Sequence, residues 1–357
     1  PDAHTPGSLL EGTPSTPCSG NILGRLPWKT LGLPDLRDSS GERLWYAVSA
    51  NFKNSPRIGT LNSDTPGTIT VFASAGNILH DGGVNGTGAV AVIIAPGAIL
   101  RRQGASTLQD RGAAGAANPE NYLDIGNGED NANFTDGSAT NGFIYGPVLG
   151  ADAEGKPIVI VNDRLIPITY QDLMPKLEKR VAGEVLKCLA DYAVDNNGRY
   201  PWAADINDSG GGNYQDKNDN RFGRIPDTTF DTTDDVGMGN NWSGSCNIIS
   251  GSGWWLNWKE LVFYGLADAY KPINPPNPPA ANACNTVGAC LVVNLPSTTV
   301  NKQVVVIVAG KLLPGQFRTA GNKGIVANYL ENPNQGGIAF AQGSPTSITL
   351  NDTLVYR

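Results

Sequence analysis

Two stretches of this sequence read Val90-Ala-Val-Ile-Ile-Ala-Pro-Gly-Ala-Ile-Leu100 and Val304-Val-Val-Ile-Val-Ala-Gly-Lys-Leu-Leu-Pro314. Each is an apolar, β-branched run that stops at glycine and proline, which is typical of a buried strand. The two runs resemble each other, and the likeness extends in both directions along the chain. They therefore predict buried strands in two related copies.

Three further pairs of segments match in the same order. In the first pair, Trp28-Lys-Thr-Leu31 followed by Leu44-Trp-Tyr-Ala-Val48 matches Trp258-Lys-Glu-Leu261 followed by Phe263-Tyr-Gly-Leu-Ala267. In the second, Glu120-Asn-Tyr-Leu-Asp124 matches Ala327-Asn-Tyr-Leu-Glu331. In the third, Asn162-Asp-Arg-Leu-Ile-Pro-Ile-Thr-Tyr170 matches Asn351-Asp-Thr-Leu-Val-Tyr356. Matches that keep one order indicate a duplicated domain. We expect a first domain at residues 1–170 and a second at residues 171–357.

One segment between the copies has the pattern of a helix, at about 172–197. Its apolar residues recur at spacings of three and four: Leu177, Val181, Val185, Cys188 and Tyr192. Asp172 is suited to cap its start, and Asn197-Gly198 supplies a stop. We expect its apolar face to lie on the sheet of the second copy, with charged residues such as Glu178 in solvent.

No such helix precedes the first copy, so one face of its sheet is expected to be apolar and uncovered. Either the helix at 172–197 is shared, or a helix is missing. A missing helix could come from a removed N-terminal segment or from another protein.

The composition excludes some classes of protein. Charged residues make up 17% of the 357 residues and hydrophobic residues 40%, which predicts a folded chain. A net charge of −7 without clustered basic residues argues against nucleic-acid binding. The longest apolar runs fall short of the ~18 residues that a membrane helix needs, so no membrane span is expected.

The five cysteines predict disulfides rather than a metal or redox site, because no Cys-x-x-Cys pair is present. Cys284 and Cys290 lie six apart in a turn-rich segment and are expected to pair. Cys188, in the helical segment, and Cys246, in a loop, could pair as well, which would leave Cys18 without a partner.

One loop carries oxygen ligands at a spacing that suits Ca²⁺. Asp216, Asn218 and Asn220 alternate, and Asp227 is at the twelfth position. Gly223 is at the eighth position rather than the sixth, and basic residues dilute the charge. The alternative is a turn-rich surface loop held by side-chain to backbone hydrogen bonds.

Aromatic residues cluster from residue 242 to residue 264. Trp254 and Trp255 could bind a partner or a glycan, since exposed aromatics supply binding energy at low entropic cost. The alternative is that most of the cluster is core. His4 and His80 are isolated from any evident nucleophile, so no catalytic residue is expected.

Three segments carry a resemblance to a known family. They read Leu26-Pro-Trp-Lys-Thr-Leu-Gly-Leu-Pro-Asp35, Gly41-Glu-Arg-Leu-Trp-Tyr-Ala-Val-Ser49 and, after the predicted helix, Asn197-Gly-Arg-Tyr-Pro-Trp202. Together they resemble prepilin-like proteins of bacterial type IV pilus and type II secretion systems. The resemblance implies an α+β fold of two tandem pilin-like domains with antiparallel sheets, the second led by a long packing helix at about 172–197.

The resemblance also implies what the missing N-terminal helix would be. In that family a hydrophobic N-terminal helix anchors the subunit, and a cysteine commonly follows it. That lost cysteine is a candidate partner for Cys18. Trp202 takes the equivalent place in the second copy, which leaves Cys188 as the nearest candidate for Cys246.

The function that the resemblance implies is structural, not enzymatic. We expect a pilin, minor pilin or pseudopilin ectodomain that assembles outside the inner membrane with other pilin subunits or with a separate chain carrying the N-terminal helix. The first alternative is a secreted adhesive module that binds a glycan. A weaker alternative is a hydrolase with an unrecognised site.

Overall fold

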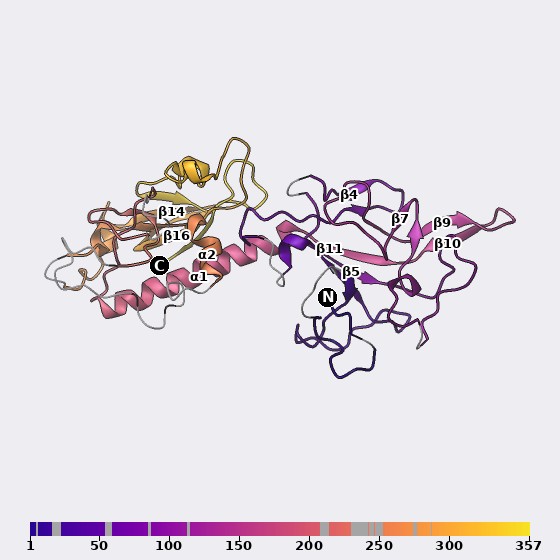
Figure 1. The fold of residues 1–357 in the computed structure, drawn as a ribbon. Helices are drawn as coiled ribbons and strands as arrows, with labels where there is room; N and C mark the ends of the chain where they lie inside the picture. The colour runs from indigo at the N-terminus through magenta and orange to yellow at the C-terminus, as the bar shows by residue number, and fades with distance from the viewer. Residues whose placement is uncertain are drawn as a thin grey trace. The chain divides into compact units, whose positions relative to one another are not determined.

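The computed structural model describes residues 1–357 except 5, 16–22, 54–58, 85–86, 113–114, 208–213, 230–241, 243–245, 247–252, 274–276 and 287. The chain divides into two compact units (Figure 1). The first comprises Pro1–Thr60 and Thr65–Leu173, and the second comprises Leu61–Asp64 and Met174–Arg357.

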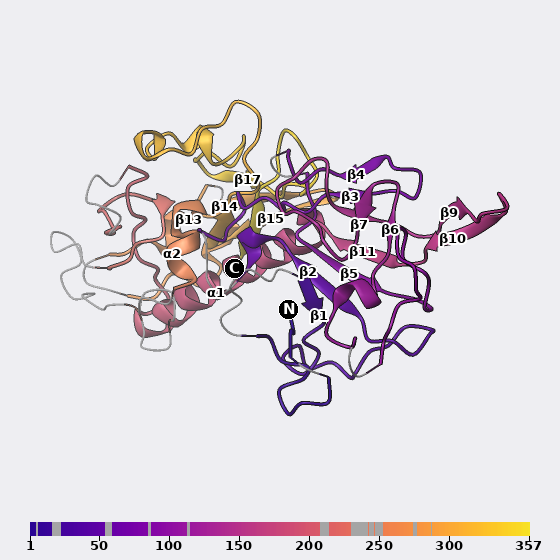
Figure 2. The ribbon, with the colours of Figure 1, turned by 45° about the vertical axis from the view of Figure 1, so that its right-hand side comes forward.

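The first unit is built on a four-stranded antiparallel sheet, here called sheet 1, and on smaller sheets. Sheet 1 has the order β1 (Leu23–Arg25), β2 (Trp45–Val48), β5 (Ala91–Ala95), β11 (Arg164–Ile168), and Figure 2 shows β1, β2 and β5 side by side. A three-stranded sheet has the order β4 (Ile78–His80), β3 (Val71–Phe72), β8 (Phe143–Ile144). Two two-stranded sheets pair β6 (Ile125–Gly126) with β7 (Glu129–Asp130) and β9 (Val148–Ala151) with β10 (Pro157–Val161).

The second unit repeats this plan. Its four-stranded antiparallel sheet, sheet 2, has the order β12 (Phe222–Arg224), β13 (Val262–Leu266), β16 (Val304–Val308), β18 (Thr353–Tyr356). A three-stranded sheet has the order β15 (Thr298–Lys302), β14 (Leu291–Leu295), β17 (Ala339–Ala341). The pair β14 and β17 is parallel, as is the pair β3 and β8 in the first unit.

Each unit packs one face of its four-stranded sheet against its three-stranded sheet. In the first unit, Trp45 and Ile94 belong to the same buried cluster as Phe143. In the second, Phe263 and Ile307 belong to the same cluster as Phe340. Fully burying a side chain of this size contributes about 1.5–3 kcal/mol, so these two clusters are the cores that hold the units together.

The long helix α1 spans Tyr170–Asp195 and begins two residues earlier than the sequence predicts. Thr169 precedes it and donates both its backbone N–H and its hydroxyl to the Asp172 carboxylate. Asp172 therefore satisfies the helix start from inside the first turn, as in a capping box. Gly198, with φ of 82°, donates its N–H to Ala193 O at 2.7 Å and ends the helix.

The predicted fold class is wrong. An α+β fold with pilin-like domains led by a long packing helix was expected, but the described residues are mostly β and form six small sheets. Besides α1 they contain one α-helix, α2 (Trp255–Trp258), and short 3-10 turns such as η1 (Ala50–Phe52) and η2 (Pro119–Asn121). The physical reason is the content of 44 glycines and 25 prolines, which interrupt strands and favour turns.

Candidate functional site

The two four-stranded sheets place equivalent residues in equivalent rows. Trp45 pairs with Ile94 in sheet 1, and Phe263 pairs with Ile307 in sheet 2. These rows face the core of their unit. The neighbouring row points to the opposite face, because side chains alternate along a strand. We call that face the outer face; its central row is Tyr46, Ile93 and Ile166 in sheet 1 and Tyr264, Val306 and Val355 in sheet 2.

Helix α1 covers the outer face of sheet 2. Thr353 of β18 donates its hydroxyl to the Glu178 carboxylate of α1 at 2.9 Å, and both residues are buried. The expectation that Glu178 lies in solvent is therefore wrong. Tyr264 is fully buried and donates its hydroxyl to Pro201 O, just beyond the helix. Burial raises the pKa of the Tyr264 phenol well above its usual value.

The outer face of sheet 1 is partly open. Ile166 is 63% exposed, and Tyr46 and Ile93 are only half-buried, whereas Val306, which is equivalent to Ile93, is fully buried. Apart from the first turn of α1, the helices described in the first unit are the three-residue turns η1 and η2. The apolar central row is therefore covered by a helix in the second unit and is partly exposed to solvent in the first.

A second duplicated feature is a buried arginine that binds loop backbone. In the first unit Arg111 donates to Gly97 O at 2.8 Å and to Asn121 O at 2.9 Å. In the second unit Arg318 donates to Gly310 O and to Asn328 O, each at 2.9 Å. Because each arginine donates to backbone carbonyls of its own unit, the two arginines stabilise the loops of that unit. We call this arrangement the framework.

Each arginine is accompanied by a buried pair of acids. Asp163 Oδ2 accepts from Asp124 N and from Asn131 Nδ2, both at 2.8 Å. Asp352 Oδ2 accepts from Glu331 N at 3.2 Å and from Asn334 at 3.0 Å. The same arrangement thus recurs in each unit.

Burial is the main influence on the charge of these acids. It raises the pKa of Asp124 to about 6. It also raises the pKa of Asp163 well above the ordinary value, as does the nearby charge of Asp124. Burial and the nearby charge of Glu331 likewise raise the pKa of Asp352. Folding therefore shifts these acids toward their protonated forms relative to water. Within the described residues Oδ1 of Asp163 and of Asp352 has no hydrogen-bond partner.

Two of the four predicted calcium ligands bond to protein groups. The Asp227 carboxylate accepts from Tyr214 N, Trp255 Nε1 and Lys259 Nζ. Asn220 donates its amide to Ala203 O and Ala204 O. Asp216 is buried, and Asn218 is exposed. In the described part of the chain, no group of three or more His, Cys, Asp or Glu side chains could hold a metal ion.

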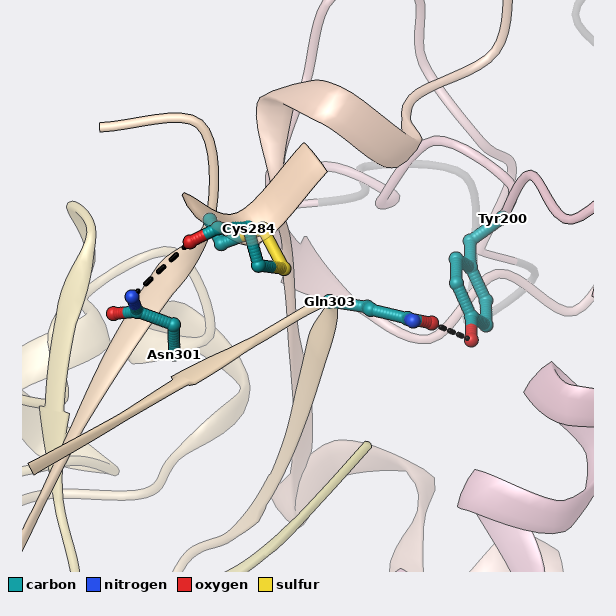
Figure 3. Close-up of a disulfide and its surroundings, with 5 residues drawn as sticks. Tyr200, Cys284, Asn301 and Gln303 are labelled. Atoms are coloured by element: carbon teal, nitrogen blue, oxygen red, sulfur yellow. Dashed lines mark hydrogen bonds between the residues drawn. A yellow bond between two sulfur atoms is a disulfide. The ribbon is translucent and has the colours of Figure 1, made fainter. Parts of the chain in front are cut away.

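Four cysteines form two disulfides, Cys188 with Cys246 and Cys284 with Cys290. Figure 3 shows the second of these beside β15 and β16. Asn301 donates its amide to Cys284 O at 3.2 Å, and Tyr200 donates its hydroxyl to Gln303 Oε1 at 2.8 Å. These bonds tie the disulfide loop and the segment after α1 to the strands. Cys18 lies outside the described residues.

The two predicted partner-binding tryptophans have different environments. Trp255 is 2% exposed, and its indole N–H donates to Asp227 Oδ1 at 3.2 Å. Trp254 is half-buried, and its ring meets that of Trp255 edge-on with centroids 5.9 Å apart. Trp254 is therefore the one with an accessible surface.

The structure also shows what the sequence comparison missed. Gly24-Arg25-Leu26-Pro27 and Gly223-Arg224-Ile225-Pro226 are equivalent, and the sequence signal is the pattern Gly-Arg, an aliphatic residue, then Pro. Trp28 and Trp258 both lie between the first two strands of their four-stranded sheets, Trp28 shortly after β1 and Trp258 at the end of α2, just before β13. The register also shifts the match of the two apolar runs by one residue, since Ala91 corresponds to Val304.

Comparisons with known proteins leave the family open: no protein-family model, curated protein or solved structure matches the chain. In the described residues, no helix has the length and apolar character needed to cross a membrane.

Proposed function

We propose that this chain is a structural subunit that assembles with other subunits outside the cytoplasm, and that the outer face of sheet 1 receives a helix from one of them. The observation that carries the proposal is the difference between two equivalent rows. Tyr264 and Val306 are fully buried beneath α1, whereas Tyr46 and Ile93 are half-buried and Ile166 is 63% exposed.

The covering helix of the second unit indicates the chemistry of the occupant. The buried positions of α1 are mostly apolar, and four of them recur at spacings of four, three and four: Val181, Val185, Cys188 and Tyr192. A partner helix for sheet 1 needs a similar stripe, because it would cover a row of the same shape and polarity. No charged side chain stands in the central row of the outer face, so apolar burial would supply most of the binding energy.

Two other observations support an assembling role outside the cytoplasm. Two disulfides are typical of proteins that fold in an oxidising compartment. Segments 26–49 and 197–202 resemble prepilin-like proteins, which assemble into filaments through helices. The finer assignment to a bacterial pilus or a secretion filament is part of this proposal. No reaction is proposed for the chain.

The experiment uses the α1 sequence as the helix probe. A labelled peptide of residues 170–195, with serine in place of Cys188, is titrated with the full chain, and binding is followed by fluorescence anisotropy. The tethered α1 competes for sheet 2 at a high effective concentration, so the peptide should bind at sheet 1. Saturable binding that Ile166→Asp weakens at least tenfold is expected.

A matched control is available on the hairpin of β9 and β10. Leu149 is 64% exposed, nearly the same as Ile166, but it lies away from the outer face. Leu149→Asp should leave peptide binding unchanged. The proposal is wrong if the peptide does not bind the unaltered chain, or if the two substitutions weaken binding equally.

A further inference from the structure

The second unit contains an open hollow of about 430 Å³ beside helix α1. It is lined by Trp254 and Trp258 of the α2 segment, by Leu177, Arg180, Val181 and Glu184 of α1, and by Leu61. A volume of this size lies within the range of pockets that hold small ligands, about 300–1,000 Å³.

The walls of the hollow are held in place by interactions within the unit. Trp258 is buried, and Trp254 rests edge-on against Trp255, whose indole is bonded to Asp227. The α2 segment is also fixed by a distant part of the chain, because Asn62 donates its amide to Asn257 O at 2.9 Å. The hollow therefore exists before any ligand arrives, and little ordering would oppose binding.

The apolar and charged groups that line the hollow indicate the chemistry of its ligand. Two indole rings and aliphatic side chains offer an apolar surface, while Arg180 supplies donors and Glu184 supplies acceptors one helical turn away. The two charges are opposite, so an anionic or cationic ligand would meet one like charge. A neutral molecule with an apolar face and several hydroxyls satisfies all of these groups.

We propose that this hollow binds a neutral saccharide, with a pyranose ring against Trp254 and its hydroxyls bonded to Arg180 and Glu184. This inference goes beyond the assembling function and does not depend on it, because the hollow belongs to the second unit and the open outer face belongs to the first. Either one can fail without the other.

The test is titration of the full chain with neutral oligosaccharides (maltotriose, cellotriose and chitotriose), followed by calorimetry and tryptophan fluorescence. Saturable binding of at least one sugar is expected, and Trp254→Ala should weaken it at least tenfold. Trp254→Phe, which keeps an aromatic face, should retain part of the affinity. Glu184→Gln should weaken binding less than Trp254→Ala, because the amide still offers an acceptor.

The matched control is Trp28→Ala. Trp28 is also half-buried but lies in the first unit, with its ring beside Lys29. Its loss should change the emission but not the affinity for sugar. N-acetyl-tryptophanamide serves as the rival probe. If that probe binds and no sugar does, the hollow takes aromatic side chains and the proposal is wrong. Sugar affinity that is unchanged in Trp254→Ala, with the unfolding midpoint also unchanged, would overturn it as well.

Discussion

Arg111 and Arg318 occupy equivalent positions in the two units and contact the same kind of ring. The guanidinium carbon of Arg111 lies 5.1 Å from the centre of the Tyr122 ring, and that of Arg318 lies 5.4 Å from the centre of the Tyr329 ring. Both also bind the backbone of the loop that leaves their central strand. The two copies therefore share their polar framework, whereas their outer faces differ.

This framework predicts a large loss of stability when the arginine is removed. Arg318→Met leaves the carbonyls of Gly310, Asn328 and Tyr329 without their donor and leaves Asp64 without its ion-pair partner. Leaving a buried acceptor without its hydrogen bond costs about 1–3 kcal/mol, and three carbonyls lose their donor here. We expect the free energy of unfolding of the second unit to fall by about 3 kcal/mol or more, measured by urea denaturation.

A solvent-exposed ion pair provides the control. Lys217 and Asp205 are 2.6 Å apart, with both side chains about half exposed. Lys217→Met should change the free energy of unfolding by less than about 1 kcal/mol, since exposed pairs contribute little. Equal losses in Arg318→Met and Lys217→Met would contradict the framework role.

The framework was difficult to predict because its members are distant in sequence. The apolar runs at 90 and 304 form β5 and β16, because β-branched residues carry a local signal for buried strands. Gln109, Arg111 and Asp124 have no such signal, and only their packing brings them together. The same holds for the fold class: the spacing in α1 is local, but the division into small sheets depends on where turns interrupt the strands.

The buried acids predict a pH dependence with a defined sign. An acid whose pKa is raised on folding binds more protons in the folded state, so stability falls as the pH rises through the raised value. For Asp124 the window runs from the ordinary 3.8 to about 6. This rise corresponds to about 3 kcal/mol. Asp163, whose pKa is raised further by burial and by Asp124, extends the window upward.

Asp163→Asn removes one of these titrations. The free energy of unfolding, measured from pH 4 to pH 8, should fall less steeply with pH in this variant than in the unaltered chain. The new amide keeps an oxygen to accept from Asp124 N and Asn131 Nδ2. Asp110→Asn, at an exposed position, should leave the slope unchanged. A slope that is the same in all three proteins would mean that Asp163 does not titrate differently on folding.

Two glycines are predicted to be necessary because another backbone segment crosses them. A Cβ on Gly223 would lie 1.9 Å from Ala204 O, and one on Gly24 would lie 2.6 Å from Asp2 O. Overpacking of this kind costs about 1–3 kcal/mol, so Gly24→Ala and Gly223→Ala should both lower the unfolding free energy, the latter more. Gly183→Ala in α1 meets no atom within 4 Å and should stabilise by about 0.5–1 kcal/mol. A loss in Gly183→Ala similar to that in Gly223→Ala would contradict the steric argument.

The two disulfides should differ in their contributions to stability, because they close loops of very different length within one unit. Cys188 and Cys246 are 58 residues apart, and Cys284 and Cys290 are 6 apart. The chain-entropy model gives about 4 kcal/mol for the longer loop and about 2 kcal/mol for the shorter. Replacing each pair with alanine and measuring urea denaturation should therefore show the larger loss of unfolding free energy for the Cys188 and Cys246 pair.

Burial is expected to increase this difference, since Cys188 and Cys246 are both buried while Cys284 is only half-buried. If the Cys284 and Cys290 variant is the less stable of the two, loop entropy does not dominate, and the bond between Asn301 and Cys284 O becomes the first contact to test.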